Sequence, residues 1–73
     1  MKIVLTDHAK ERLRDRNISL NVIKSALLKP DVVKPSFDDR EIAIKVVGGK
    51  TIEVVYSKEK GDKYIIITVY YGN

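Results

Sequence analysis

The chain contains one histidine and four arginines, and three of those arginines follow the histidine within one short stretch. His8, Arg12 and Arg16 recur every four residues, so in a helix that turns about 100° per residue they lie along one edge. Lys10 and Arg14 fall on the far side of the same helix. Imidazole exchanges a proton near neutral pH, and the planar guanidinium fork suits a phosphate group. The spacing therefore predicts proton transfer beside a bound phosphate.

The remaining composition excludes several kinds of chemistry. A lone histidine without any cysteine argues against a zinc site, and Gly48-Gly49 lacks the helix and Lys-Ser/Thr pair of a phosphate-binding loop. We therefore expect neither a metal nor a cofactor. These features fit metal-independent cleavage of RNA, in which the substrate's own 2′-hydroxyl is the nucleophile and the protein supplies acid–base groups and cations.

A structural role is the alternative for each of these side chains. His8 lies near the start of the predicted helix, where its ring can bond a backbone carbonyl. Arg12 and Arg16 can pair with Glu11 or Asp15 at helical spacing. The sequence alone does not decide between a catalytic and a structural role for these side chains.

A second acid–base group must come from another part of the chain, because there is no second imidazole. Tyr70 and Tyr64 are the candidates, although the high pKa of a phenol makes it a poor base. Thr68 lies in the same apolar stretch, where a β-branched residue is also ordinary strand composition.

Two helices precede the strands. Thr6 is a suitable N-cap for a helix over about residues 7–16, and Asn17 is a suitable left-handed residue after it. Ser19 begins a second amphipathic helix, which Pro30 ends. The two helices form a hairpin with a very short connection.

Alternating and apolar runs predict the strands that follow. Gly48-Gly49 is typical of a two-residue hairpin turn, and Pro35 places its own strand at an edge of the sheet. The last strand is the most apolar, so we expect it to be central or covered on both faces. The predicted strands cover about residues 31–37, 40–47, 51–57 and 64–71.

Segregated helices and strands indicate an α+β domain that spans residues 1–73. We expect two N-terminal helices packed on a four-stranded antiparallel sheet, with residues 1–5 available for a short N-terminal strand. The helix pair must bury its apolar stripe on one sheet face, which leaves the histidine–arginine edge at the rim of a groove.

The net charge of +4 is confined to the helical half of the chain. Residues 1–35 carry eight Lys/Arg against four Asp/Glu, and residues 36–73 carry six against six. This asymmetry favours a polyanion such as RNA, or an acidic protein, although a solvated lysine-rich surface is the alternative. Residues 1–5 are too short for a signal peptide and no apolar run reaches membrane-spanning length, so we expect a cytoplasmic protein without a membrane partner. An exposed strand edge near Pro35 also allows a homodimer.

Three segments together carry a recognisable pattern, namely His8-Ala9-x-x-Arg12-Leu13-x-x-Arg16-x-Ile18-Ser19, Lys29-Pro30-Asp31 and Ile67-Thr68-Val69-Tyr70. This pattern resembles a family of small bacterial and archaeal domains of unknown function. That family is similar to the toxin-like ribonucleases that include RelE, ParE-like proteins, colicin D and EndoU.

The resemblance implies a RelE-like fold that binds RNA at the groove between sheet and helix. His8, Arg12 and Arg16 match the polar positions of the first helix, and Thr68 and Tyr70 match the final strand. It implies an endoribonuclease, and the toxin of a toxin–antitoxin pair with a protein antitoxin as partner. Because ParE-like members act on gyrase, the alternative is a non-catalytic module that binds nucleic acid or a protein, either an antitoxin or a gyrase-like target.

Overall fold

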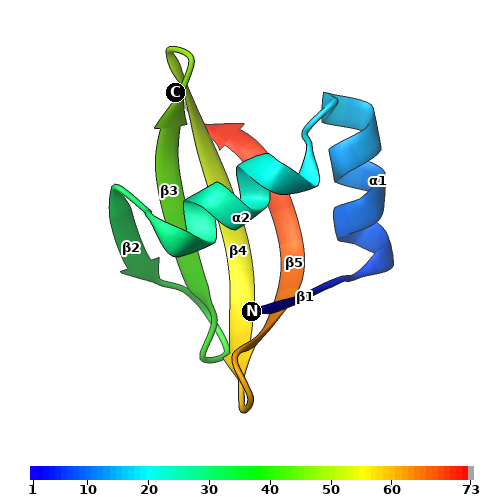
Figure 1. Cartoon of the computed structure of the whole chain (residues 1–73), viewed down its shortest axis with the longest axis vertical. Coiled ribbons are helices and arrows are strands. Elements are labelled where there is room, and N and C mark those ends of the chain that lie inside the picture. The colour runs from blue at the N-terminus through cyan, green and yellow to red at the C-terminus, as the bar shows by residue number, and fades with distance from the viewer. Residues whose placement is uncertain (73) are drawn as a thin grey trace.

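The computed structural model describes residues 1–72 and contains two helices and five strands in the order βααββββ (Figure 1). The elements are β1 (Lys2–Leu5), α1 (Asp7–Arg16), α2 (Leu20–Leu28), β2 (Val32–Pro35), β3 (Glu41–Val47), β4 (Lys50–Glu59) and β5 (Lys63–Gly72). The α+β class and the two N-terminal helices are confirmed. No helix within residues 1–72 has the length and apolar character needed to cross a membrane.

Local capping explains the helix bounds. The Thr6 hydroxyl accepts the N–H of Ala9 at 3.1 Å, and the Ser19 hydroxyl accepts the N–H of Val22 at 3.3 Å. Asn17 adopts the left-handed conformation with φ 53° and ψ 46°, which ends α1. The caps predicted from the sequence are therefore confirmed at all three positions.

The sheet is mixed and has five strands in the order β1-β5-β4-β3-β2. Strands β2 to β5 form an antiparallel meander, as predicted, but β1 pairs in parallel with β5. The expected four-stranded antiparallel sheet is therefore wrong by one parallel edge strand. The physical reason is that β1 and β5 lie at opposite ends of the sequence. A strand of four residues carries no pattern that could specify such a distant partner.

The predicted strand positions are otherwise confirmed. Pro35 lies on the edge strand β2, all four residues of which are exposed. Gly48 and Gly49 form the β3–β4 turn with positive φ. The apolar strand β5 is interior, between β1 and β4.

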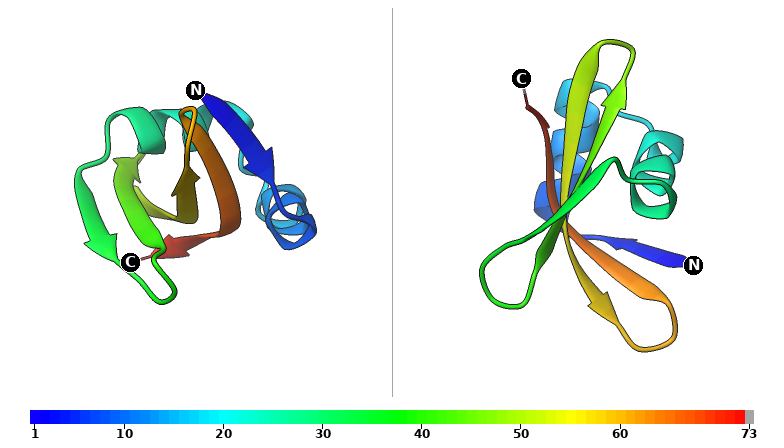
Figure 2. Two further views of the ribbon diagram at one scale, coloured as in Figure 1. Left: turned by 90° about the horizontal axis from the view of Figure 1, so that it is seen from below. Right: turned by 90° about the vertical axis from the view of Figure 1, so that its left-hand side faces the viewer.

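Both helices pack on the same face of the sheet. Ala9 of α1 and Ile23 and Ala26 of α2 are fully buried in one cluster with Val54 of β4 and Ile66 of β5. Figure 1 shows α2 crossing the sheet and α1 running beside β5, and Figure 2 shows the strong twist of the strands. Only one face of β5 is therefore covered by helices, so the alternative of coverage on both faces is wrong.

The opposite sheet face, here named the uncovered face, carries rows of side chains from residues that pair across β3, β4 and β5. One row runs Ile42, Val55, Thr68 and a second runs Ile44, Glu53, Tyr70 across β3, β4 and β5. Val55 is only 8% exposed, yet it lies outside the core cluster, as expected for a residue on this second face.

A β-bulge in β5 decides which side chains reach the uncovered face. Tyr56 of β4 pairs with Ile66, and the adjacent Val55 pairs with Thr68, so Ile67 is the extra residue. As a result Ile66 and Val69 both enter the core, and Thr68 turns to the uncovered face. Simple alternation would have placed Ile66 and Thr68 on the same face.

Candidate functional site

The histidine and the first arginine of α1 contact each other directly. Arg12 Nε donates to His8 Nε2 at 3.4 Å. His8 is exposed and Arg12 is half-buried. A ring nitrogen can accept a hydrogen bond when it carries no proton, and Nε2 is the accepting atom in this contact. The two terminal NH₂ groups of Arg12 remain available to donate to a ligand.

The structural alternative for these side chains is absent from residues 1–72. The salt bridge found there joins the N-terminus of Met1 to Asp62 at 3.0 Å, and neither Arg12 nor Arg16 pairs with an acidic side chain. No hydrogen bond joins His8 to a backbone carbonyl in the same residues. The cationic edge is therefore not neutralised by its own helix.

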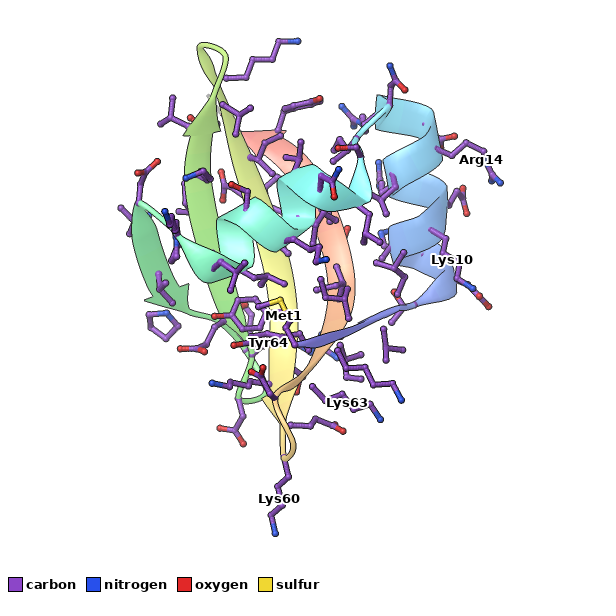
Figure 3. The ribbon with its side chains drawn as sticks, in the orientation of Figure 1. Met1, Lys10, Arg14, Lys60, Lys63 and Tyr64 are labelled. Atoms are coloured by element: carbon purple, nitrogen blue, oxygen red, sulfur yellow. The ribbon has the colours of Figure 1, made fainter. Side chains whose placement is uncertain are left out.

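The far side of α1 carries the other two cations. Lys10 and Arg14 project away from the sheet in Figure 3, which confirms their predicted direction. Helical geometry separates Lys10 from His8, and Arg14 from Arg12, by about 160° around the axis. His8 and Arg12 therefore lie on a different side of α1 from Lys10 and Arg14.

Hydrogen bonds hold α1 alongside β5. The Thr6 hydroxyl donates to the carbonyls of Ile66 at 2.9 Å and Ile67 at 3.0 Å, and it caps α1 as well. At the other end of the helix, the Tyr71 hydroxyl donates to the carbonyl of Arg16 at 3.5 Å. The strand that carries Thr68 therefore runs beside α1 from one end of the helix to the other.

The two parts of the predicted site lie on neighbouring elements, but the β5 residues face the side of the sheet opposite the helices. Thr68 and Tyr70 are half-buried on the uncovered face of β5. No hydrogen bond within residues 1–72 joins either one to His8, Arg12 or Arg16. A substrate that contacts both sets must bridge them.

Tyr70 has a neighbour that the sequence reasoning missed. Glu53 of β4 lies directly opposite Tyr70 in the β4–β5 register. Burial, and then the Glu53 carboxylate, raise the pKa of Tyr70 above its ordinary value. Tyr70 is therefore held as a protonated phenol, which donates a hydrogen bond and is a poor base. An acidic residue in the middle of an apolar alternating run was the available signal for Glu53.

Tyr64, the other predicted acid–base candidate, belongs to the core. It is 9% exposed, and its ring lies 5.5 Å from that of Tyr56. The Tyr56 hydroxyl donates to Glu41 Oε1 at 3.2 Å, and burial followed by Glu41 raises the pKa of Tyr56 to about 12. Figure 3 shows Tyr64 beside Met1, below the level of Lys10 and Arg14 of α1 in that view. This pair stabilises the sheet end and is remote from Arg16.

Residues 1–72 present the candidate site as an open surface, with no enclosed pocket. In the same residues no three side chains of the metal-binding types lie close enough together to hold an ion. The chemistry available to the site as described is acid–base exchange at His8 and anion binding at Arg12 and Arg16.

Comparison with known proteins gives one match. Residues 5–71 match a family described as "Domain of unknown function (DUF4258)". None of the curated proteins and none of the solved structures matches the chain.

Proposed function

The chain belongs to the DUF4258 family, and we propose that it is a metal-independent endoribonuclease whose active edge is the His8–Arg12–Arg16 row of α1. The observation that carries this proposal is the hydrogen bond from Arg12 Nε to His8 Nε2 on an exposed surface. It joins a proton acceptor to a phosphate-binding group without an acidic partner that would neutralise either one.

The reaction assigned to this edge is attack of an RNA 2′-hydroxyl on the adjacent phosphorus. His8 Nε2 leaves its contact with Arg12 and takes the 2′-hydroxyl proton, while the new O–P bond forms and the P–O5′ bond breaks. The 5′-oxygen leaves with a proton from water. The products are a 2′,3′-cyclic phosphate and a 5′-hydroxyl.

The guanidinium groups stabilise the charge that develops in this step. Arg12 binds the non-bridging phosphate oxygens through its free NH₂ groups, because a charge-assisted pair of this kind is stronger than a neutral hydrogen bond. Arg16, two turns beyond His8, holds the next part of the backbone. Thr68 and Tyr70 position the chain on the neighbouring strand.

The resemblance of the sequence pattern to RelE-like and colicin D-like toxins supports a further part of the proposal. It favours RNA as the substrate, a toxin of a toxin–antitoxin pair as the biological role, and an antitoxin as the protein partner. We propose the cytoplasm as the location for the same reason, since cellular RNA is found there.

A non-catalytic binding module is the second candidate. The position of Tyr70 on the sheet face opposite the helices favours it, because no second acid–base side chain is hydrogen-bonded to His8 within residues 1–72. Such a module binds RNA or a protein partner through the same cations without breaking a bond.

Incubation of the purified protein with total RNA in EDTA distinguishes the two candidates. Cleavage by the wild type, lost in His8→Ala and retained in Lys10→Ala, supports the endoribonuclease. Lys10 is the matched control because it lies on the far side of the same helix. Binding without cleavage supports the binding module, and identical RNA patterns for the wild type and His8→Ala overturn the catalytic role of His8.

A further inference from the structure

Glu53 occupies an unusual position on the uncovered face. It stands between Ile44 of β3 and Tyr70 of β5, with Val55 two residues along its own strand. The side chain is half-buried in this largely apolar setting. A carboxylate that gives up part of its hydration requires hydrogen-bond donors in exchange.

The partners of Glu53 within residues 1–72 do not include a cation. No lysine or arginine forms a salt bridge with it. Its register neighbour Tyr70 offers a single hydroxyl, whereas an ionised carboxylate has about four acceptor positions. Most of the acceptor capacity of Glu53 is therefore available to a ligand.

The absence of a side chain at Gly72 makes room for this carboxylate. A β-carbon at residue 72 would collide with Oε2 of Glu53, so the carboxylate lies directly over the glycine. Gly72 also pairs with Thr51, two residues along β5 from the Glu53–Tyr70 pair. The side chain is thus held against the strand surface beside the Tyr70 ring.

We propose that Glu53 and Tyr70 form a nucleobase subsite that selects guanine in the single-stranded RNA held by the α1 edge. The inference rests on the proposed function and names its sequence preference. Within residues 1–72, β1 pairs with β5 only as far as Ile66, and α1 runs beside the part of β5 that follows. RNA bound at Arg12 therefore has only β5 to pass around before a base reaches Glu53 and Tyr70 on the uncovered face.

Guanine is the base that complements a carboxylate. It alone presents two adjacent donors on its Watson–Crick edge, the N1–H and the N2 amino group, which suit the two oxygens of Glu53. The other three bases place an acceptor beside their donor, and a carboxylate repels that acceptor. Proteins read single-stranded RNA by hydrogen bonds to this edge combined with stacking on aromatic rings, and Tyr70 offers such a ring.

The test measures binding of 2′-O-methyl heptamers, which cannot be cleaved by 2′-hydroxyl attack. Each heptamer is a uridine run with guanine, adenine, cytosine or inosine at its centre. One good bidentate base contact is worth roughly 5- to 150-fold in affinity, so we expect the guanine heptamer to bind the wild type at least about 10-fold more tightly than the adenine or cytosine heptamer. Inosine lacks the N2 amino group and should lose most of this preference.

Two variants complete the experiment. Glu53→Gln should reduce the guanine-to-adenine ratio of affinities to within about twofold, whereas Glu59→Gln should keep the wild-type ratio. Glu59 is the matched control because it is an exposed glutamate on the same face of β4, paired with Lys63.

A wild-type ratio near one, or a ratio unchanged in Glu53→Gln, overturns the guanine subsite while leaving RNA binding in place. Failure of all four heptamers to bind at low salt overturns both the subsite and the proposed function. Because inosine tests the wild-type protein, the inference does not depend on the stability of any variant.

Discussion

Arg12 donates to His8 across 3.4 Å, one turn apart on the exposed edge of α1. A guanidinium at this distance repels a second positive charge, and an anion placed between the two side chains would relieve that repulsion and accept hydrogen bonds from both. The proposed phosphate site uses this arrangement.

The first prediction compares two arginines of α1. Arg12→Ala should weaken binding of uncleavable RNA at low salt and reduce the slope of log affinity against log salt by roughly 0.7 to 1, because one phosphate contact is lost. Arg14→Ala removes the same charge from the side facing away from the sheet and should change the slope less. Binding titrations at four salt concentrations measure both slopes, and equal changes in the two variants would rule out a specific role for Arg12.

The second prediction concerns the attachment of α1 to β5. Thr6→Ala removes a helix cap together with hydrogen bonds to the carbonyls of Ile66 and Ile67, so it should lower the free energy of unfolding by about 1–3 kcal/mol. Ser19→Ala removes only a helix cap and should cost about 1 kcal/mol. Urea denaturation measures the free energy of unfolding of both variants. If Ser19→Ala is the less stable of the two, the hydrogen bonds of Thr6 to β5 do not hold α1 in place.

The third prediction follows from Tyr56, whose pKa rises to about 12 in the folded protein from 10.0. At a pH below about 10 the phenol is protonated in both the folded and the unfolded chain, and its full contribution to stability is present. Between about pH 10 and 12 it ionises in the unfolded chain first, which favours unfolding, so the contribution is lost over this range. The free energy of unfolding should therefore fall more steeply over this range in the wild type than in Tyr56→Phe. If the free energy of unfolding falls equally steeply with pH in the two proteins, Tyr56 has the same pKa in the folded and the unfolded chain, and the prediction is wrong.

Much of the fold could be predicted because it depends on local chemistry. Thr6, Asn17 and Ser19 determine the helix bounds through their own caps, and the glycine pair at 48–49 supplies the positive φ of the hairpin. These features need no knowledge of distant residues. The parallel pairing of β1 with β5 depends on such knowledge, and the prediction therefore missed it.

The candidate site shows the same division. The α1 edge follows from helical spacing, so His8 and Arg12 could be paired from the sequence. The face of β5 depends on the bulge at Ile67, which strand alternation does not reveal. Glu53 becomes a candidate ligand-binding residue only because Tyr70 lies opposite it on β5. That pairing is set by the register of β4 against β5, which the sequence does not reveal.

The chemical ends of the RNA products test the central claim most directly. A labelled oligoribonucleotide incubated with the protein in EDTA should yield 2′,3′-cyclic phosphate and 5′-hydroxyl ends by mass spectrometry. His8→Ala should yield none, and a single 2′-deoxy substitution should block cleavage at the substituted position. Cleavage that persists in His8→Ala, or that passes through a 2′-deoxy position, would contradict 2′-hydroxyl attack assisted by His8.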